Sequence, residues 1–229
     1  MYECHIILDF EMNPVLKDHK EVYSNLRNEI IEVGAVKLDK DLNIVDKFDR
    51  FVKPQYNYQV TPYITRLTGI QSVKTLNAPT LELVLPEFVQ WIGNSPKTRI
   101  YSWSDNDFIQ LKTECQLKNI PFPSNMKIWR DFQKVFPKMM HIQHPPKSPM
   151  ALKEAIRYSG ITVDSKKVHS ALYDSELTTE LLIPILNGEY KTQVEYVNTY
   201  MNNTSSSSTL GDMCGGLLAA LLKDMNSEE

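Results

Sequence analysis

"HIILDFEM", residues 5–12, joins an apolar run to two acidic residues. The apolar residues 6–8 are bulky and β-favouring, as a strand buried in a sheet requires. Residues i and i+2 of a strand point to the same side, so the carboxylates of Asp9 and Glu11 lie side by side and repel each other. Water, basic partners or a metal cation must offset that repulsion. The segment therefore predicts a core strand whose acidic end needs a partner.

The composition is that of an ordinary soluble globular protein. A length of 229 residues, with 42% hydrophobic and 23% charged residues, fits one substantial domain or one domain with an appendage. The net charge of −3 argues against nonspecific duplex binding, which usually shows a basic excess. It remains compatible with a nucleic-acid enzyme whose acids are neutralised by metals.

Targeting signals and a disulfide framework are not expected. The N-terminus lacks a secretory pattern, and no apolar run approaches the roughly 18 residues of a membrane span. Cys4, Cys115 and Cys214 are far apart and form no CxxC pair. This usage predicts reduced thiols, no zinc module and a cytoplasmic protein without membrane contact.

Strands and helices alternate along the first 190 residues. The apolar patterns predict further strands at 29–39, 43–53 and 98–104, with a hairpin turn between the first two. They predict helices at 61–70, 80–93, 105–118, 150–160 and late in 169–188, and a short strand running into a helix within 126–136. The polar segment 13–28 is predicted to be a loop. This order predicts an α/β fold, with a mixed sheet flanked by helices.

The C-terminal segment differs in composition from the rest of the chain. "NNTSSSS", residues 202–208, is typical of a low-complexity linker. Apolar residues then recur at helical spacing over 210–225, which predicts an amphipathic helix. That helix would dock on its own domain, or bind a protein partner or dimerise. A membrane-surface role is disfavoured because Lys223 is its only basic residue.

Three groups of acidic residues lie at the ends of predicted elements. Asp9 and Glu11 end the first strand, "SWSDNDFIQL" (102–111) spans a strand-to-helix junction, and "HSALYDSE" (169–176) opens the last helix. Binding and catalytic residues gather at such ends. Each motif alone occurs by chance in chains of this size, but their order and context together predict one shared acidic site.

This set resembles the DEDD, or DnaQ-like, superfamily of 3′→5′ exonucleases, which have a ribonuclease-H-like fold with a mixed five-stranded sheet. Asp9 and Glu11 match the first motif, Asp107 the second and Asp174 the third. A histidine five residues before the last aspartate, here His169, marks the DEDDh subgroup. Within this subgroup, the "DFE" and "NEIIE" segments most resemble the branch of histone-mRNA and RNA-interference-related exonucleases. That branch has bacterial sporulation-inhibitor relatives.

The second motif offers two aspartates, Asp105 and Asp107. Asp107 has Leu111 four residues later and fits the family's helix-opening pattern better. We therefore expect Asp107 to be the metal ligand.

The resemblance implies a metal-dependent hydrolase that releases nucleoside 5′-monophosphates. Four carboxylates would hold two divalent cations, and hard oxygen ligands suit Mg²⁺ or Mn²⁺. One cation would lower the pKa of a water, and the other would stabilise the leaving 3′-oxygen. His169 is the candidate general base, because a neutral imidazole accepts a proton near neutral pH.

Five other residues are candidates for substrate binding. Leu67 and Thr68 match family positions that cradle the terminal nucleotide, and Met12 is expected to line the same pocket. Trp103 and Phe108 flank the second motif and could stack on a base. Each also has an ordinary structural interpretation, as a core residue or a helix cap.

The resemblance covers about residues 4–188. It implies an exonuclease domain at 1–190, a helix end and linker at 191–208, and the amphipathic helix at 209–229, whose part 209–226 is a candidate for partner or dimer contact. The expected substrate is a single-stranded 3′ end of RNA, with DNA left open.

Two alternatives remain. One is a DNA exonuclease of proofreading or repair type. The other is a non-catalytic regulatory module that uses this fold to bind a protein partner. The complete catalytic set argues against the second, because a binding module has no use for mutually repelling acids.

Overall fold

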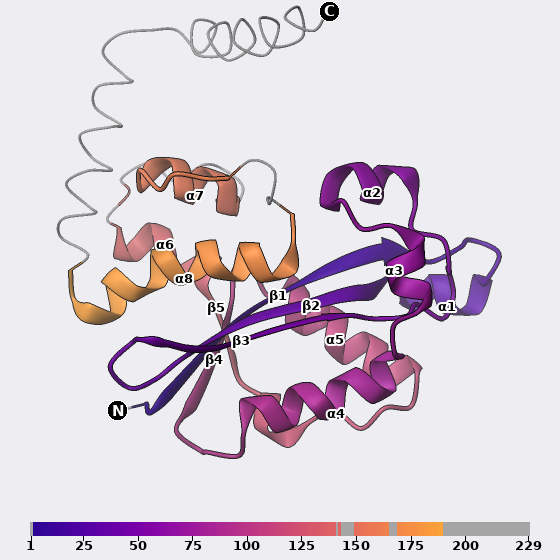
Figure 1. Ribbon diagram of the computed structural model, residues 1–229, viewed down its shortest axis with the longest axis horizontal. Helices are drawn as coiled ribbons and strands as arrows, with labels where there is room; N and C mark the ends of the chain where they lie inside the picture. The colour runs from indigo at the N-terminus through magenta and orange to yellow at the C-terminus, as the bar shows by residue number, and fades with distance from the viewer. Residues whose placement is uncertain (1, 141, 143–148, 165–168, 190–229) are drawn as a thin grey trace, which may run out of the picture.

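The computed structural model describes residues 2–140, 142, 149–164 and 169–189, which form a sheet with helices on both faces (Figure 1). The strands are β1 (Cys4–Pro14), β2 (Asn28–Leu38), β3 (Ile44–Phe51), β4 (Thr98–Ser102) and β5 (Trp129–Asp131). The helices are α1 (Lys20–Asn25), α2 (Pro62–Thr68), α3 (Ser72–Leu76), α4 (Leu81–Ile92), α5 (Asn106–Leu117), α6 (Phe132–Met139), α7 (Leu152–Tyr158) and α8 (Ala171–Asn187), with a 3₁₀ turn at Ser124–Met126.

The sheet is mixed and has the order β3-β2-β1-β4-β5. β1 pairs antiparallel with β2 and parallel with β4. At the two edges, β3 pairs antiparallel with β2, and β5 pairs parallel with β4. The predicted α/β fold with a mixed five-stranded sheet is confirmed. The pairing of β1 with β4 ends at Leu8, whereas the pairing with β2 continues to Pro14. The second half of β1 therefore has one edge that β4 does not cover, and this half carries the acids.

Side-chain alternation along β1 divides the core into two layers. Ile6 and Leu8 pack with side chains of α4 and α5, while Ile7 packs with those of α6, α7 and α8. Figure 1 shows these two groups of helices on opposite faces of the sheet. Asp9 and Glu11 are in phase with Ile7, so they lie on the face that α8 covers.

The helix α2 is positioned by its caps and by a buried asparagine. Thr61 accepts a hydrogen bond from the N–H of Ile64, and Gly69 ends the helix with φ of 73°. The fully buried Asn13 of β1 donates to the carbonyls of two residues before α2 and accepts from the N–H of Thr61 at 2.9 Å. These bonds fasten α2 beside the carboxyl end of β1.

Two short helices were not predicted from the sequence. The segment 13–28, expected to be a loop, continues β1 to Pro14 and then contains α1. The N–H of Val15 bonds to the carbonyl of Arg27, which brings the two ends of the segment together. None of the residues of α1 is buried, so its sequence lacks the apolar spacing that would predict a helix. The helix α3 has five residues, which is too short to show a helical repeat of apolar residues, and it was not predicted.

The predicted linker at 191–208 and amphipathic helix at 209–229 lie outside the described residues. Among the described helices, none has the length and apolar character needed to cross a bilayer.

Candidate active site

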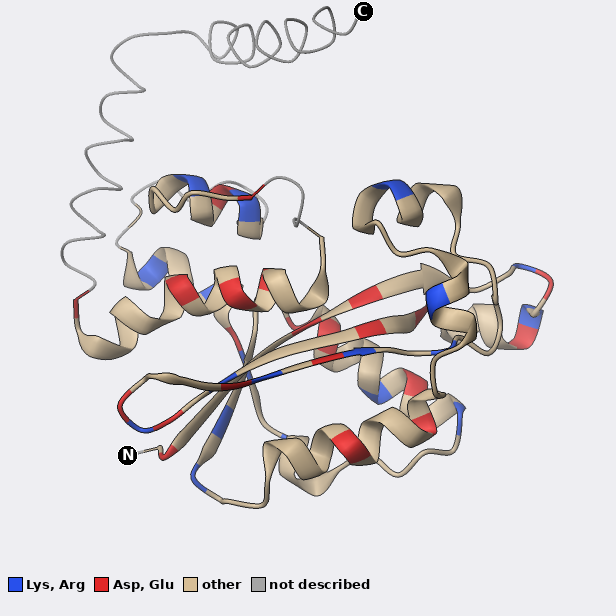
Figure 2. Cartoon of the chain, viewed as in Figure 1, with Lys and Arg blue, Asp and Glu red and all other residues tan. Residues whose placement is uncertain are grey.

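Asp9 and Glu11 lie at the centre of the site, on the half of β1 that no longer pairs with β4. Both are half-buried, and a register shift in the β1–β2 pairing follows Glu11 directly. Acidic positions mark β1 and β2 beside the start of α8 (Figure 2). The predicted side-by-side placement of these two acids follows from their strand, which keeps both on one face.

The second-motif acid is supplied from the first turn of α5. Asp107 is 5% exposed, and its carboxylate accepts the backbone N–H of Phe10 on β1. Asp105 instead forms an exposed ion pair with Lys134, with 2.5 Å between Oδ2 and Nζ. The geometry supports the choice of Asp107 over Asp105 as the member of the acid cluster.

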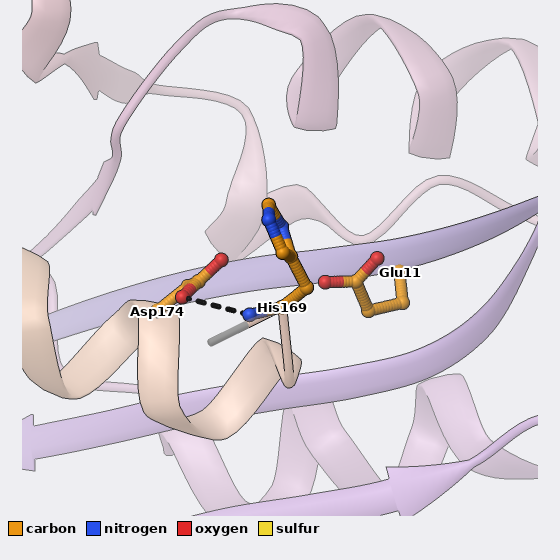
Figure 3. Close-up of side chains that lie close together, drawn as sticks. All are labelled: Glu11, His169 and Asp174. Atoms are coloured by element: carbon orange, nitrogen blue, oxygen red, sulfur yellow. Dashed lines mark hydrogen bonds between the residues drawn. The ribbon is translucent and has the colours of Figure 1, made fainter. Parts of the chain in front are cut away.

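The start of α8 completes the cluster with Asp174 and His169. One ligand atom from each of Glu11, His169 and Asp174 lies within 4.8 Å of the others. Figure 3 shows the carboxylates of Glu11 and Asp174 on either side of His169. The backbone N–H of His169 also points to Asp174 Oδ1, 3.4 Å away. All five residues expected from the motifs are thus placed at one end of the sheet.

Burial raises the pKa of all four carboxyl groups. For Asp9, burial and then the charges of Asp107 and Glu11 raise the pKa well above its usual range. Burial, together with the charges of Asp174, Glu32 and Asp107, raises the pKa of Glu11 to about 9. Burial raises the pKa of Asp107 to about 7 and that of Asp174 above its usual value. The cluster therefore holds ionised carboxylates only at a cost.

The charge of these four carboxyl groups can be compared with the basic side chains around them. Within the described part of the chain, no lysine or arginine forms an ion pair with Asp9, Glu11, Asp107 or Asp174. Oxygen donors with unbalanced negative charge are the ligands that hard divalent cations prefer. The donor set fits such ions, and bound ions would reverse the pKa shifts.

Three candidate substrate residues lie on α2 and on β1. Leu67 and Thr68 are half-buried on α2, and Met12 is half-buried against the core beside Glu11. The hydroxyl of Thr68 donates to the carbonyl of Ile64 at 2.9 Å and accepts a backbone N–H at 3.0 Å. This bonding accounts for Thr68 as a cap of α2. Substrate contact by these three residues stays a prediction.

Trp103 takes the structural alternative that the sequence left open, a place in the core. Its side chain is 7% exposed and packs against Phe132 and Phe136, and its indole N–H donates to the carbonyl of Met150 at 3.1 Å. Of the two interpretations given for Trp103, the structure favours the core residue, and base stacking by Trp103 has no support from these contacts. Phe108 is half-buried and lies edge-on to its aromatic neighbours, so a stacking role stays a prediction there.

Glu32 was missed by the sequence reasoning. It lies directly opposite Glu11 on β2, is 3% exposed and accepts the N–H of Ala171 at 2.9 Å. Burial raises its pKa to about 7. The signal was a charged residue between the apolar neighbours Ile31 and Val33, two positions before Gly34.

Known proteins resemble this chain in sequence and fold. The family model described as "Exonuclease" matches residues 6–182. DNA polymerase III PolC-type of Clostridium perfringens is 32% identical over 161 residues, which are 70% of this chain and 10% of that protein. The 3′-5′ exoribonuclease 1 of Rattus norvegicus is 26% identical over 194 residues, which are 81% of this chain and 53% of that protein.

A solved structure agrees with the same family. The nuclease domain of 3′hExo, a DEDDh family member bound to rAMP, superposes with a TM-score of 0.69 and 26% identity, covering 82% of this chain and 93% of that one. The chain spans about a tenth and about half of the length of the two relatives named above. Exonucleases of this family depend on divalent metal ions. The chain therefore belongs to the exonuclease family, within its DEDDh group of 3′→5′ exonucleases.

Proposed function

We propose that this protein removes nucleotides from the 3′ end of single-stranded RNA, in a reaction that depends on divalent cations. The observation that carries the proposal is the meeting of His169 and four carboxylates, which no lysine or arginine among the described residues pairs with, at one end of the sheet. Family membership supports the reaction class, and similarity to an exoribonuclease and to an rAMP-bound nuclease domain supports RNA.

Asp9, Glu11, Asp107 and Asp174 would hold the cations, which we propose are two Mg²⁺ or Mn²⁺ ions. Bound ions of this kind activate a water and stabilise charge on the phosphate and the leaving oxygen. The chain supplies acids from three separate elements, so the site forms only when β1, α5 and α8 are packed together.

His169 would take the proton from the attacking water. A ring nitrogen of His169 lies within 4.8 Å of carboxylate oxygens of Glu11 and Asp174, which keeps the imidazole beside the proposed metal ligands. A protonated imidazole cannot accept the proton, so the rate should fall in acid. The released product would be a nucleoside 5′-monophosphate.

Matched RNA and DNA oligonucleotides, each labelled at the 5′ end, test this function. With Mn²⁺ or Mg²⁺, we expect RNA to shorten stepwise from its 3′ end and DNA of the same sequence to shorten more slowly. Faster degradation of DNA would instead favour the proofreading or repair alternative, for which the similarity to a DNA polymerase is the supporting observation. Degradation that survives EDTA would contradict the metal-dependent reaction.

A catalytically disabled variant separates this protein from contaminating nucleases. Asp9→Asn keeps the shape of the side chain and removes one carboxylate charge, so it should abolish shortening of both oligonucleotides. Equal activity in the variant preparation would assign the nuclease to a contaminant. The proposed location is cytoplasmic, as the spacing of the cysteines in the sequence indicates.

A further inference from the structure

The backbone at His169 is held in an uncommon conformation. Its φ is 66°, in the left-handed region that residues other than glycine rarely adopt. For such a residue this conformation is sterically unfavourable, because Cβ crowds the backbone. The turn that presents His169 to the acid cluster must therefore be held by contacts around it.

The first turn of α8 lacks the usual side-chain cap. The residue at the cap position, Ser170, makes no capping hydrogen bond with its own side chain. The first N–H groups of a helix have no partner within the helix and need an acceptor elsewhere. For Ala171 that acceptor is Glu32 on β2, with 2.9 Å between N and Oε2. Glu32 of β2 thus caps α8 at Ala171, which is two residues after His169.

β2 holds the same helix at two further points. A side chain at Gly34 would bring its Cβ within 2.0 Å of the backbone nitrogen of Leu172, so only glycine permits this approach. The hydroxyl of Ser175 donates to the carbonyl of Gly34 at 3.0 Å. Glu32 and Gly34 share one face of β2 and together fix the distance and the direction of the first turn of α8.

The remaining contacts of Glu32 fix its carboxyl group. The side chain is 3% exposed and lies opposite Glu11, and it shares a hydrogen bond with the carboxyl group of Asp49 on β3. With one oxygen bonded to the N–H of Ala171 and the group bonded to Asp49, Glu32 is occupied by protein partners.

We propose that Glu32 is a positioning residue, which holds the start of α8 and thereby aims His169 at the acid cluster. The proposal rests on the exonuclease function proposed above and adds a residue to its machinery. A misplacement of about 1 Å can cost about 10²-fold in rate. Loss of this contact should therefore slow the reaction through His169 while the metal ligands remain.

Two substitutions at Glu32 separate its acceptor from its charge. Glu32→Gln keeps an oxygen for the N–H of Ala171, so kcat should stay within about threefold of the wild-type value. Glu32→Ala removes the acceptor, so kcat at saturating Mn²⁺ should fall about 10- to 100-fold with KM nearly unchanged. Similar rates for the two variants, whether both fast or both slow, would overturn the proposal.

A double-mutant cycle shows whether Glu32 acts through His169. If it does, Glu32→Ala should slow the wild-type enzyme but leave the already slow His169→Ala enzyme unchanged. An equal slowing in both backgrounds would overturn the proposal. Glu114→Ala is the matched control, because Glu114 is equally buried and accepts an N–H from Ile30 of the same strand. It should lower stability and leave kcat of the folded enzyme within about threefold.

Amide hydrogen exchange tests the same contact without any nuclease assay. The N–H of Ala171 should exchange at least tenfold faster in Glu32→Ala than in the wild type and in Glu32→Gln, while amides in the centre of α8 keep their protection. Unchanged exchange at Ala171 would overturn the proposal. A wild-type protein that degrades no nucleic acid would contradict the proposed function instead, and this exchange measurement would still be informative.

Discussion

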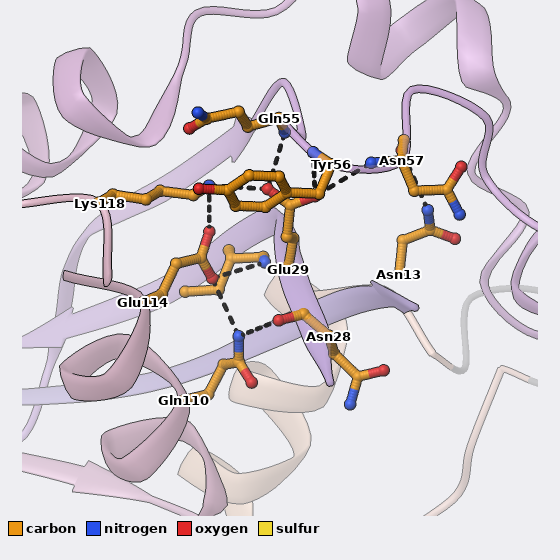
Figure 4. A network of polar contacts seen from close by, with 10 residues as sticks. Asn13, Asn28, Glu29, Gln55, Tyr56, Asn57, Gln110, Glu114 and Lys118 are labelled. Atoms are coloured by element: carbon orange, nitrogen blue, oxygen red, sulfur yellow. Dashed lines mark hydrogen bonds and ion pairs between the residues drawn. The ribbon is translucent and has the colours of Figure 1, made fainter. Parts of the chain in front are cut away.

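Two clusters of buried acids lie in this molecule, and they differ in how their charge is balanced. One is the active-site cluster of Asp9, Glu11, Asp107 and Asp174, which no described lysine or arginine pairs with. The other, shown in Figure 4, contains Glu29 of β2 and Glu114 of α5, both fully buried.

The second cluster is satisfied by donors from three elements. Glu29 accepts the N–H groups of three consecutive residues, 55–57, and Glu114 accepts those of Ile30 and of the Gln110 side chain. Lys118 pairs with both carboxylates, at 2.8 Å and 2.7 Å. Burial alone would lower the pKa of Lys118, but the attraction of the two acids outweighs it and raises the pKa.

This difference in charge balance separates acids that stabilise the fold from acids that are suited to bind a ligand. In the paired cluster, buried charge is matched by a cation and by hydrogen bonds, and it fastens the chain before α2 to β2 and α5. In the active-site cluster, no lysine or arginine of the described ranges offsets burial and mutual repulsion, and divalent cations can supply positive charge there.

The largest expected effect tests which acids belong to the active-site cluster. Asp107→Asn should lower kcat by about 10³-fold or more, because loss of a metal ligand removes several kcal/mol of transition-state stabilisation. Asp105→Asn is the control and should stay within about threefold, since Asp105 pairs with Lys134 outside the cluster. Steady-state rates at saturating Mn²⁺ decide the matter, and the reverse pattern would show that the second motif is misassigned.

The next effect tests the paired cluster. Lys118→Met should lower the free energy of unfolding by about 3–5 kcal/mol, because it leaves two carboxylates buried without a cation. Urea denaturation measures the loss. The variant that remains folded should keep a kcat near that of the wild type. Lys134→Met breaks exposed ion pairs and should change stability by less than about 1 kcal/mol. Equal losses in the two variants would contradict the assigned roles.

A third test concerns pH and the metal-free protein. Folded pKa values of about 7 for Asp107 and about 9 for Glu11 lie above those of the unfolded chain. The folded state therefore binds protons that the unfolded state releases, and stability falls as the pH rises from about 4 to about 9. In EDTA, Tm should be lower at pH 8.5 than at pH 5.5, and Mn²⁺ should restore it. A metal-free Tm that rises over this range would contradict the unbalanced cluster.

Asp9→Asn sharpens that measurement. The substitution removes one repelling charge, and repulsion that shifts a pKa by one unit is worth about 1.4 kcal/mol. We expect the metal-free variant to be more stable than the wild type at pH 8.5 by about 1 kcal/mol, and to gain little from Mn²⁺. A variant that is destabilised at this pH would assign Asp9 a role in folding.

The two clusters were not equally predictable from the sequence. Asp9 and Glu11 share one strand, so a period of two places them together without further information. Asp107, Asp174 and His169 could be added only because their motifs resemble a family. The partners of Glu29 are 26 to 89 positions away in the chain, and neither spacing nor composition connects residues at such separations.

Single aromatic and polar residues were the hardest to place. Trp103 follows a strand too short to show which face its next residue takes, and the structure packs it into the core. Glu32 looks like any strand glutamate until the first turn of α8 is seen against it. These assignments depend on how elements pack, which local patterns do not encode.

Calorimetric titration of Mn²⁺ into the metal-free protein tests the contrast between the clusters most directly. The wild type should bind two Mn²⁺ ions, and Glu114→Gln, which alters the paired cluster, should bind them equally well. Asp9→Asn should lose most of this binding, since its carboxylate lies at the centre of the active-site cluster. Equal Mn²⁺ binding by Asp9→Asn and the wild type, or loss of binding in Glu114→Gln alone, would contradict the account.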